Sequence, residues 1–503
     1  MTEKLKPSQS PANQGKSVVS GIGWNLIAVI GEQISSLVAF VLIARILGPS
    51  DFGTVILAVA LIDIFITFVR SGTSEALIRT PEMNPTVLGT GFWLNMSLAV
   101  LIATALYSFA PTFGSLFDLP GTVPLLQTMT IAFPIVAAGA VAEALLARRM
   151  AFAAIARRQV LGSLAGTATA IALAYSGYGV WAMIFQRLVI FTIGAALAIY
   201  AARLVPPLKF SISAAKEIGR FSGGITSTNL LYRLQPRATE LVIGLLAQPV
   251  AVALFRAAYR IVDLVNQLPM QPVMRVIFPT LSRLTNEPER FRAVLKKFME
   301  GLQTILLPLY VGVGYFATDI FHILFGSKWD GAVPAFVILL GAAGLRITFA
   351  LMGPAAAAKG AVKRSASFTL MDVSLSILVM TIVAPWGIEA IAGSRVAVAF
   401  MLWPIAYYTL MKPMGLTFSD VVHSLKNPIL IAVLLLSCLA GVNHFYSYFD
   451  IPQYFVLNLI VSALLYTVLI VAISWKGLAE LLTVCGINYS KFTSRIITKI
   501  RSK

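Results

Sequence analysis

Apolar residues occupy this chain in long runs, and polar residues collect in the short stretches between them. Most runs are about 20 residues long, the length that a helix needs to cross the hydrocarbon core of a bilayer. The pattern predicts an all-α integral membrane protein with about 14 transmembrane helices. The predicted spans are 18–46, 52–72, 87–110, 123–147, 157–176, 179–201, 221–247, 250–280, 299–325, 331–357, 366–385, 388–411, 428–446 and 455–474. The segment 250–280 contains Pro269, Pro272 and Pro279, which are expected to kink or break it.

The composition agrees with a membrane protein. Of the 503 residues, 58% are hydrophobic and only 12% are charged, and the mean hydropathy is +0.84. A soluble protein of this size needs more charged residues on its surface. Cys438 lies in an apolar run and Cys485 in the basic tail, so a disulfide framework is not indicated. Residues 1–17 are polar and the run after them is long enough to span, so no cleavable signal peptide is expected.

The net charge of +18 raises the question of nucleic-acid binding, but the distribution of the basic residues argues against it. Arginine and lysine gather at the two ends of the chain and in alternate connections, at 148–158, 203–220, 283–297 and 359–364. The intervening connections hold little beyond Lys328. Cytoplasmic loops of membrane proteins carry this excess of positive charge, so both termini are predicted to be cytoplasmic.

A faint internal repeat relates two parts of the chain. Residues 40–64 align without gaps with residues 240–264, and the identities are Ile43/Ile243, Pro49/Pro249, Ala58/Ala258 and Asp63/Asp263. Both copies begin on the same side of the membrane, which predicts a parallel pseudo-repeat of two six-helix lobes. The predicted organisation is a cytoplasmic tail 1–17, a first lobe 18–201, a cytoplasmic linker 202–220, a second lobe 221–411, two further helices within 428–474 and a basic cytoplasmic tail 475–503.

Two successive spans carry the same charged pattern in apolar surroundings. The spacing is i, i+4, i+7 in both, which places each set within an arc of about 60° on one helix face. Charges at membrane depth normally face the bundle interior or a watery cavity. The two sets are Arg233, Arg237 and Glu240, and Arg256, Arg260 and Asp263.

These faces are interpreted as the substrate-binding surface, together with Arg346 in the tenth span. Each face has two arginines for one carboxylate, and arginine binds phosphate through two parallel hydrogen bonds, so a diphosphate group is the expected ligand. The alternative is that the charges only pair with one another. Glu32 and Asp63, near the middle of the first two spans, are candidates for a coupling cation or proton, or for sugar hydroxyls. The scattered histidines predict no metal site, and no catalytic motif or cofactor-binding motif is present.

Seven segments resemble the signatures of one transporter family. They are IARILGPSDFG at 43–53, SGTSEALIRTPEMN at 71–84, RRMAFAAIARR at 148–158, YSGYGVWAMIFQRL at 175–188, ALFRAAYRIVDLVNQLP at 253–269, VIFPTLSRLTNEPERFR at 276–292 and LFGSKWDGAVPAFVILLGAAG at 324–344. The chain resembles the Wzx-type polysaccharide transporters of the MOP superfamily, which also holds the lipid II flippase MurJ and the MATE antiporters. In this family an Asp often precedes an LLIG-like stretch in the seventh span; here that place reads Arg237-Ala238-Thr239-Glu240.

The resemblance implies two six-helix lobes around a central cavity and alternating access in the bacterial inner membrane. The implied substrate is an undecaprenyl-diphosphate-linked oligosaccharide, flipped for exopolysaccharide, capsule or O-antigen synthesis. The implied partners are membrane lipid, a polysaccharide polymerase and a chain-length regulator, and no nucleic acid or enzymatic activity is implied. Two alternatives stay open: a MATE-like antiporter, which should prefer acidic cavity residues, and a membrane polymerase or glycosyltransferase, which normally needs a larger outer loop.

Overall fold

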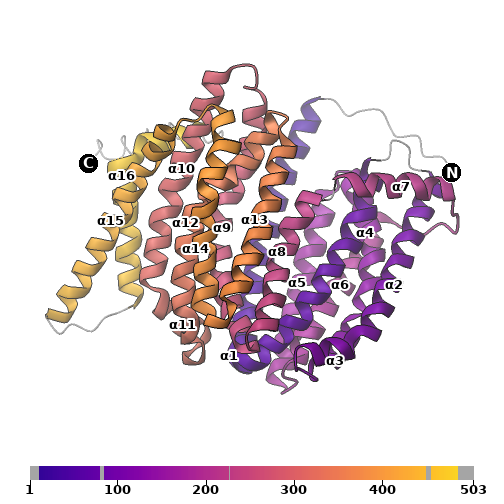
Figure 1. The fold of residues 1–503 in the computed structure, drawn as a ribbon. Coiled ribbons are helices and arrows are strands. Elements are labelled where there is room, and N and C mark those ends of the chain that lie inside the picture. Colours follow the sequence, from indigo (N-terminus) through magenta and orange to yellow (C-terminus); the bar gives the residue numbers. More distant parts are fainter. Residues whose placement is uncertain (1–10, 80–83, 226, 449–454, 485–503) are drawn as a thin grey trace, which may run out of the picture. The chain divides into compact units, whose positions relative to one another are not determined.

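The computed structural model describes the backbone of residues 11–79, 84–225, 227–448 and 455–484. Within these ranges it leaves out the side chains of 11–30, 32, 71–76, 79, 220–225, 227–233, 447–448, 455–456 and 475–484. The described backbone is helical with short connections and contains no strand, as the sequence predicts (Figure 1). The chain divides into two compact units, Met1–Ala253 and Leu254–Lys503.

The first unit is a bundle built around its long first helix. Helix α1 packs against α3, α4, α5, α7 and α8, while α6 covers α4 and α5. Helix α7 lies across the ends of the other helices in Figure 1; it begins in the predicted linker 202–220 and continues into the predicted span 221–247. The helices are α1 (Pro11–Arg79), α2 (Pro85–Leu116), α3 (Thr122–Met129), α4 (Ala132–Arg148), α5 (Phe152–Tyr175), α6 (Trp181–Ala202), α7 (Ile212–Ile225) and α8 (Ser227–Leu246), followed by the start of α9 (Pro249–Ser282).

Helix α1 contains two of the predicted spans, which are separated by a break at Gly48. The Gly48 backbone has φ 75° and ψ 170°, a conformation that favours glycine because it has no Cβ. Pro49 follows and begins the second half, where its missing N–H costs nothing. In the second copy of the repeat, α8 ends at Leu246 and α9 begins at Pro249. The chain therefore turns at the same place in both copies.

The two turns lie directly against each other within the first unit. A Cβ on Gly53 would lie 1.9 Å from the Pro249 carbonyl oxygen, so any larger residue would force the backbones apart. A Cβ on Gly244 would similarly lie 2.2 Å from a methyl group of Leu57. Small residues permit this close packing of α1 and α8. Helix α8, predicted from the sequence to open the second lobe, thus packs in the first unit.

The second unit is a bundle in which α10 is the central element. It packs against α12 on one side and against α15 and α16 on another, while α14 contacts both α12 and α13 (Figure 1). The main helices are α9, which continues through its three prolines to Ser282, α10 (Pro288–Tyr315), α11 (Ala317–Phe325), α12 (Val333–Ala358), α13 (Val362–Val383), α14 (Ile388–Ala406), α15 (Phe418–Tyr448) and α16 (Phe455–Val484). The 3₁₀ segments η1 (Ser327–Ala332), η2 (Ala384–Trp386) and η4 (Lys412–Met414) and the π-turn η3 (Tyr407–Met411) connect or extend them.

Among the described residues, nine helices are long and apolar enough to cross a membrane. The number rises to ten if α10 and α11, which are bent by 67° relative to each other, form one span. The multi-pass membrane fold is confirmed, but the predicted total of about 14 spans is not. Helices α5, α8 and α9, which carry several of the charged side chains discussed below, are not among the nine.

Candidate functional site

Asp63 is the centre of an ion-pair network in the first unit. Its carboxylate, on α1, accepts hydrogen bonds from both terminal nitrogens of Arg187 on α6, one of them at 3.0 Å. Arg237 on α8 approaches the same carboxylate, with its Nη2 at 2.8 Å from Oδ2. Asp63 thus connects three helices through two guanidinium groups.

Arg237 extends the network to a second carboxylate. Its Nη1 donates to Glu240, at 2.9 Å from Oε2 and 3.2 Å from Oε1, and Glu240 is 2% exposed. Carboxylates on both sides of Arg237 compensate the cost of burying this charge, which is high for an isolated ion. The sequence-based alternative, in which Arg237 pairs with Glu240, is therefore realised for this residue, with Asp63 as an additional partner.

A second charged cluster lies in the same unit. Glu143 on α4 forms an ion pair with Arg158 on α5, and its other oxygen lies 3.4 Å from Arg70 on α1. Beside this cluster is a cavity of about 270 Å³. Its lining comes from α1, α4, α5 and α6 and comprises Ser36, Arg70, Val136, Gly139, Ala140, Glu143, Arg158, Gln159, Ser163, Gln186, Arg187, Ile190, Phe191, Gly194 and Ala195. We refer to it as the first-unit cavity.

The second unit contains a smaller charged cluster. Arg346 on α12, a predicted site residue, is ion-paired with Asp372 on α13, and Ser376 donates to Asp372 at 3.3 Å. Arg395 on α14 lies near both residues and is hydrogen-bonded to Tyr259 on α9. Arg346 therefore links α12 to α13 through Asp372.

The predicted arginine face of α9 is partly buried. Arg256, Arg260 and Asp263 all have intermediate exposure. Asp263 accepts a hydrogen bond from Gln267 Nε2 at 2.7 Å, one turn further along the same helix. Asp263 is thus engaged within α9, whereas its repeat counterpart Asp63 connects neighbouring helices.

For two predicted site residues, Glu32 and Arg233, the structure gives the backbone but not the side chain. The side chains of Glu32 and Arg233 lie outside the described residues, although both positions are on helices, α1 and α8. The structure thus brings Asp63, Arg237 and Glu240 together in the first unit, and Arg346 belongs to the second unit.

Sequence reasoning missed the residues that complete these clusters. Arg187 and Arg158 lie inside two of the family-like segments, at 175–188 and 148–158, so a signal was present for both. Asp372 and Arg395 are charged residues within predicted spans, which is itself a functional signal. Glu143 lies close to the end of its predicted span, where a charged residue is a weaker functional signal than in the middle of a span.

A large apolar pocket of about 520 Å³ lies in the second unit. It is formed by α10, α12, α14 and α15, with mostly aliphatic side chains and three aromatic rings. Its lining comprises Leu307, Tyr310, Val311, Gly314, Tyr315, Val337, Leu340, Gly341, Gly344, Leu345, Thr348, Trp403, Leu425, Ile429 and Leu436. We refer to it as the second-unit pocket, and its surface suits a hydrocarbon chain better than a sugar.

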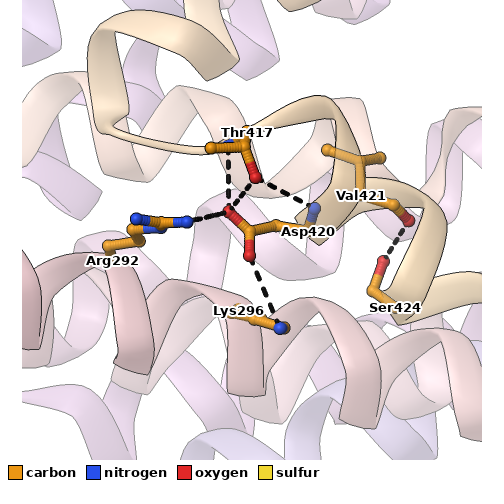
Figure 2. A network of polar contacts seen from close by, with 6 residues as sticks. All are labelled: Arg292, Lys296, Thr417, Asp420, Val421 and Ser424. Atoms are coloured by element: carbon orange, nitrogen blue, oxygen red, sulfur yellow. Dashed lines mark hydrogen bonds and ion pairs between the residues drawn. The ribbon is translucent and has the colours of Figure 1, made fainter.

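A polar cluster joins the beginnings of α10 and α15 (Figure 2). Asp420 accepts from Arg292 at 2.7 and 3.0 Å, from the Thr417 backbone N–H at 2.9 Å and from the Thr417 hydroxyl at 2.7 Å, and Lys296 lies 3.5 Å away. On the other face of α10, Phe291, Leu295 and Phe298 are fully buried. The apolar face of this basic segment therefore packs inside the second unit.

Within the described part of the chain, no group of three or more His, Cys, Asp and Glu side chains is arranged to hold a metal ion. The clusters are dominated by arginine–carboxylate pairs, which are suited to binding anions and to holding helices together.

Comparison with known proteins shows what the chain is similar to. It is 27% identical over 330 residues to the succinoglycan biosynthesis transport protein ExoT of Rhizobium meliloti (strain 1021), covering 66% of this chain and 67% of ExoT. It is 24% identical over 422 residues to the lipopolysaccharide biosynthesis protein WzxC of Escherichia coli (strain K12), covering 82% of this chain and 85% of WzxC.

The fold is similar to that of a solved flippase structure. The lipid II flippase MurJ, in an inward closed conformation, matches with a TM-score of 0.72 and 14% sequence identity, covering 90% of this chain and 98% of that structure. This likeness confirms the predicted fold class. The polysaccharide biosynthesis protein family matches residues 42–334, which is more than half of the sequence. The chain belongs to the polysaccharide biosynthesis protein family.

Proposed function

We propose that this protein flips a polyprenyl-diphosphate-linked oligosaccharide from the cytoplasmic to the outer leaflet of a bacterial inner membrane. The observation that carries the proposal is the family match over residues 42–334, a range that includes both arginine faces. The relatives named as transport and lipopolysaccharide biosynthesis proteins support a polysaccharide substrate. The protein acts as a transporter, not an enzyme.

The diphosphate is assigned to Arg256 and Arg260. Both lie on one face of α9 and are partly buried. Two adjacent guanidinium groups can bind the oxygens of a diphosphate through parallel hydrogen bonds. Arg237 is ion-paired with both Asp63 and Glu240, so we assign it to positioning α8.

The polyprenyl tail is assigned to the second-unit pocket. Its lining includes Leu425, Ile429 and Leu436 of α15, one of the two helices that follow the predicted second lobe. Apolar side chains gain free energy by covering a hydrocarbon chain of this kind. The charged head group then travels through the interior while the tail remains in an apolar environment.

Transport is proposed to occur by alternating access. The basic connections support cytoplasmic termini. No nucleotide-binding motif is present in the sequence, so an ion gradient is the proposed source of drive. Asp63 is engaged by two arginines, so Glu32 becomes the preferred coupling residue. A polymerase and a chain-length regulator remain proposed partners.

The two alternative functions receive less support. A cation-exporting antiporter of the MATE type needs acidic residues facing its substrate, whereas the α9 face carries two arginines for one aspartate. A polymerase or glycosyltransferase needs a catalytic constellation, whereas the Glu143–Arg158, Asp63–Arg187 and Asp372–Arg346 clusters are arginine–carboxylate pairs that bridge helices.

Gene deletion and complementation test the proposal. Cells that lack the protein should accumulate lipid-linked oligosaccharide in the membrane and lose the surface polysaccharide, and the wild-type gene should restore it. Arg256→Ala and Arg260→Ala should fail to restore it, because each removes a diphosphate ligand. Arg275→Ala is the matched control, since Arg275 lies on the same helix but is exposed. Normal export by both Ala variants would contradict the assigned site, and normal polysaccharide in the deletion strain would contradict the function.

A further inference from the structure

The first-unit cavity is polar, although the helices around it are rich in apolar residues. Three arginines, one glutamate and two glutamines face it: Arg70, Arg158, Arg187, Glu143, Gln159 and Gln186. The proposed diphosphate and tail sites do not use this cavity. Burying polar groups in a membrane bundle costs free energy unless they are hydrogen-bonded or hydrated, so such a cavity is a candidate functional site.

The three arginines differ in how firmly the protein holds them. The side chain of Arg158 is only 7% exposed and is ion-paired with Glu143, and Arg187 makes two hydrogen bonds with Asp63. Arg70 has a single long contact, 3.4 Å to Glu143, and 46% of its side chain is exposed. Arg70 can therefore bind an incoming anion without breaking the packing of the bundle, while Glu143 keeps Arg158 as its partner.

The size and charge of the cavity limit what it can accept. Its volume of about 270 Å³ is just below the range of about 300–1,000 Å³ that is usual for drug-sized ligands, so it accommodates one sugar-sized group and not a whole oligosaccharide. Glu143 beside Arg70 lowers the positive potential, which disfavours a multiply charged diphosphate. Gln159 and Gln186 offer amide donors and acceptors, which suit sugar hydroxyls.

We propose that the first-unit cavity binds an acidic sugar of the transported oligosaccharide, with its carboxylate on Arg70 and its hydroxyls near Gln159 and Gln186. The inference rests on the proposed function and adds a substrate class to it: repeat units that contain a hexuronic acid. The guanidinium group of Arg70 and a carboxylate form a charge-assisted, two-pronged contact, which gives selectivity over a neutral hexose.

Binding is tested first with the purified full-length protein and free monosaccharides. At equal ionic strength, glucuronate at tens of millimolar should raise the unfolding temperature, whereas glucose and inorganic phosphate should not. Arg70→Gln should abolish the shift and Arg70→Lys should reduce it, because lysine keeps the charge but loses the fork. Arg149→Gln is the matched control, since Arg149 donates to the Ala202 carbonyl at 2.9 Å and does not line the cavity. No shift with glucuronate, or an equal shift in Arg70→Gln, would overturn the proposal.

A transport assay then distinguishes failure of this inference from failure of the proposed function. Proteoliposomes receive two lipid-linked oligosaccharides that differ only in one hexuronic acid replacing one hexose. The wild type should move the acidic one about tenfold faster, the effect of one charge-assisted contact, and Arg70→Gln should reduce the ratio below about twofold. Equal rates for both substrates in the wild type would overturn the inference alone. If neither substrate moves, the proposed function is wrong, and the glucuronate shift still decides whether the cavity binds an acidic sugar.

Discussion

Asp63 and Asp263 occupy aligned positions of the predicted repeat, but their surroundings differ. Asp63 binds Arg187 and Arg237, and so connects α1 with α6 and α8. Asp263 accepts from Gln267, one turn along its own helix. Asp63 therefore bridges helices, whereas Asp263 lies on the same helix as Arg256 and Arg260, which we assign to the substrate.

The comparison also explains why charge within a membrane protein is not by itself a sign of a binding site. Arg237 and Arg260 look equivalent in the sequence, each four residues after another arginine. In the structure, Arg237 contacts two carboxylates, one of which comes from another helix. Removing a partner from such a network leaves a buried charge uncompensated, whereas removing a ligand residue affects binding.

The largest expected effect comes from removing Asp63. Asp63→Ala should lower the free energy of unfolding by about 3–5 kcal/mol, because Arg187 and Arg237 lose a shared carboxylate in a desolvated site. Asp263→Ala should cost less than about 1 kcal/mol, because its hydrogen bond to Gln267 lies within one helix, where such pairs contribute about 0.2–0.5 kcal/mol. Equilibrium unfolding in mixed detergent micelles measures both values. Equal losses in the two variants would remove the distinction between the copies.

Substitutions of Arg237 and Arg260 are expected to affect stability and transport differently. Arg237→Met should lower both the unfolding temperature and the amount of protein in the membrane, since Glu240 is left buried without this partner. Arg260→Met should abolish polysaccharide export while the unfolding temperature stays close to that of the wild type. Membrane abundance, thermal unfolding and export are measured on the same preparations. Loss of folding in Arg260→Met, with export intact in Arg237→Met, would reverse the assignments.

A smaller effect is expected where α10 meets α15. Asp420→Ala removes contacts to Arg292, Lys296 and Thr417 and should cost about 1.5–3 kcal/mol of unfolding free energy, the range for hydrogen bonds to charged groups. Asp330→Ala is the matched control: Asp330 is exposed and its contact to His322 is 3.9 Å, so its loss should cost less than about 0.5 kcal/mol. Equal stability of the two variants would show that the polar cluster contributes nothing measurable.

Helix positions and membrane insertion could be predicted from the sequence because they depend on local apolar runs. The breaks at Gly48 and Pro249 also followed from local residues. The partners of the charged residues could not be predicted, because a pair such as Arg187 with Asp63 depends on which helices are neighbours and on their relative rotation. Only Arg237 with Glu240, three residues apart on one helix, was within reach. The same limitation hid Asp372 as the partner of Arg346.

The central claim is that the protein moves a lipid-linked oligosaccharide across the membrane with Arg260 as a diphosphate ligand. The most direct measurement uses proteoliposomes containing the purified protein and a fluorescent polyprenyl-diphosphate oligosaccharide, with a membrane-impermeant quencher added to one side. The wild type should expose the substrate from the inner leaflet to the quencher, while Arg260→Ala should behave like protein-free vesicles and Arg275→Ala like the wild type. Equal flipping by the wild type and Arg260→Ala, or none by the wild type under any imposed ion gradient, would contradict the account.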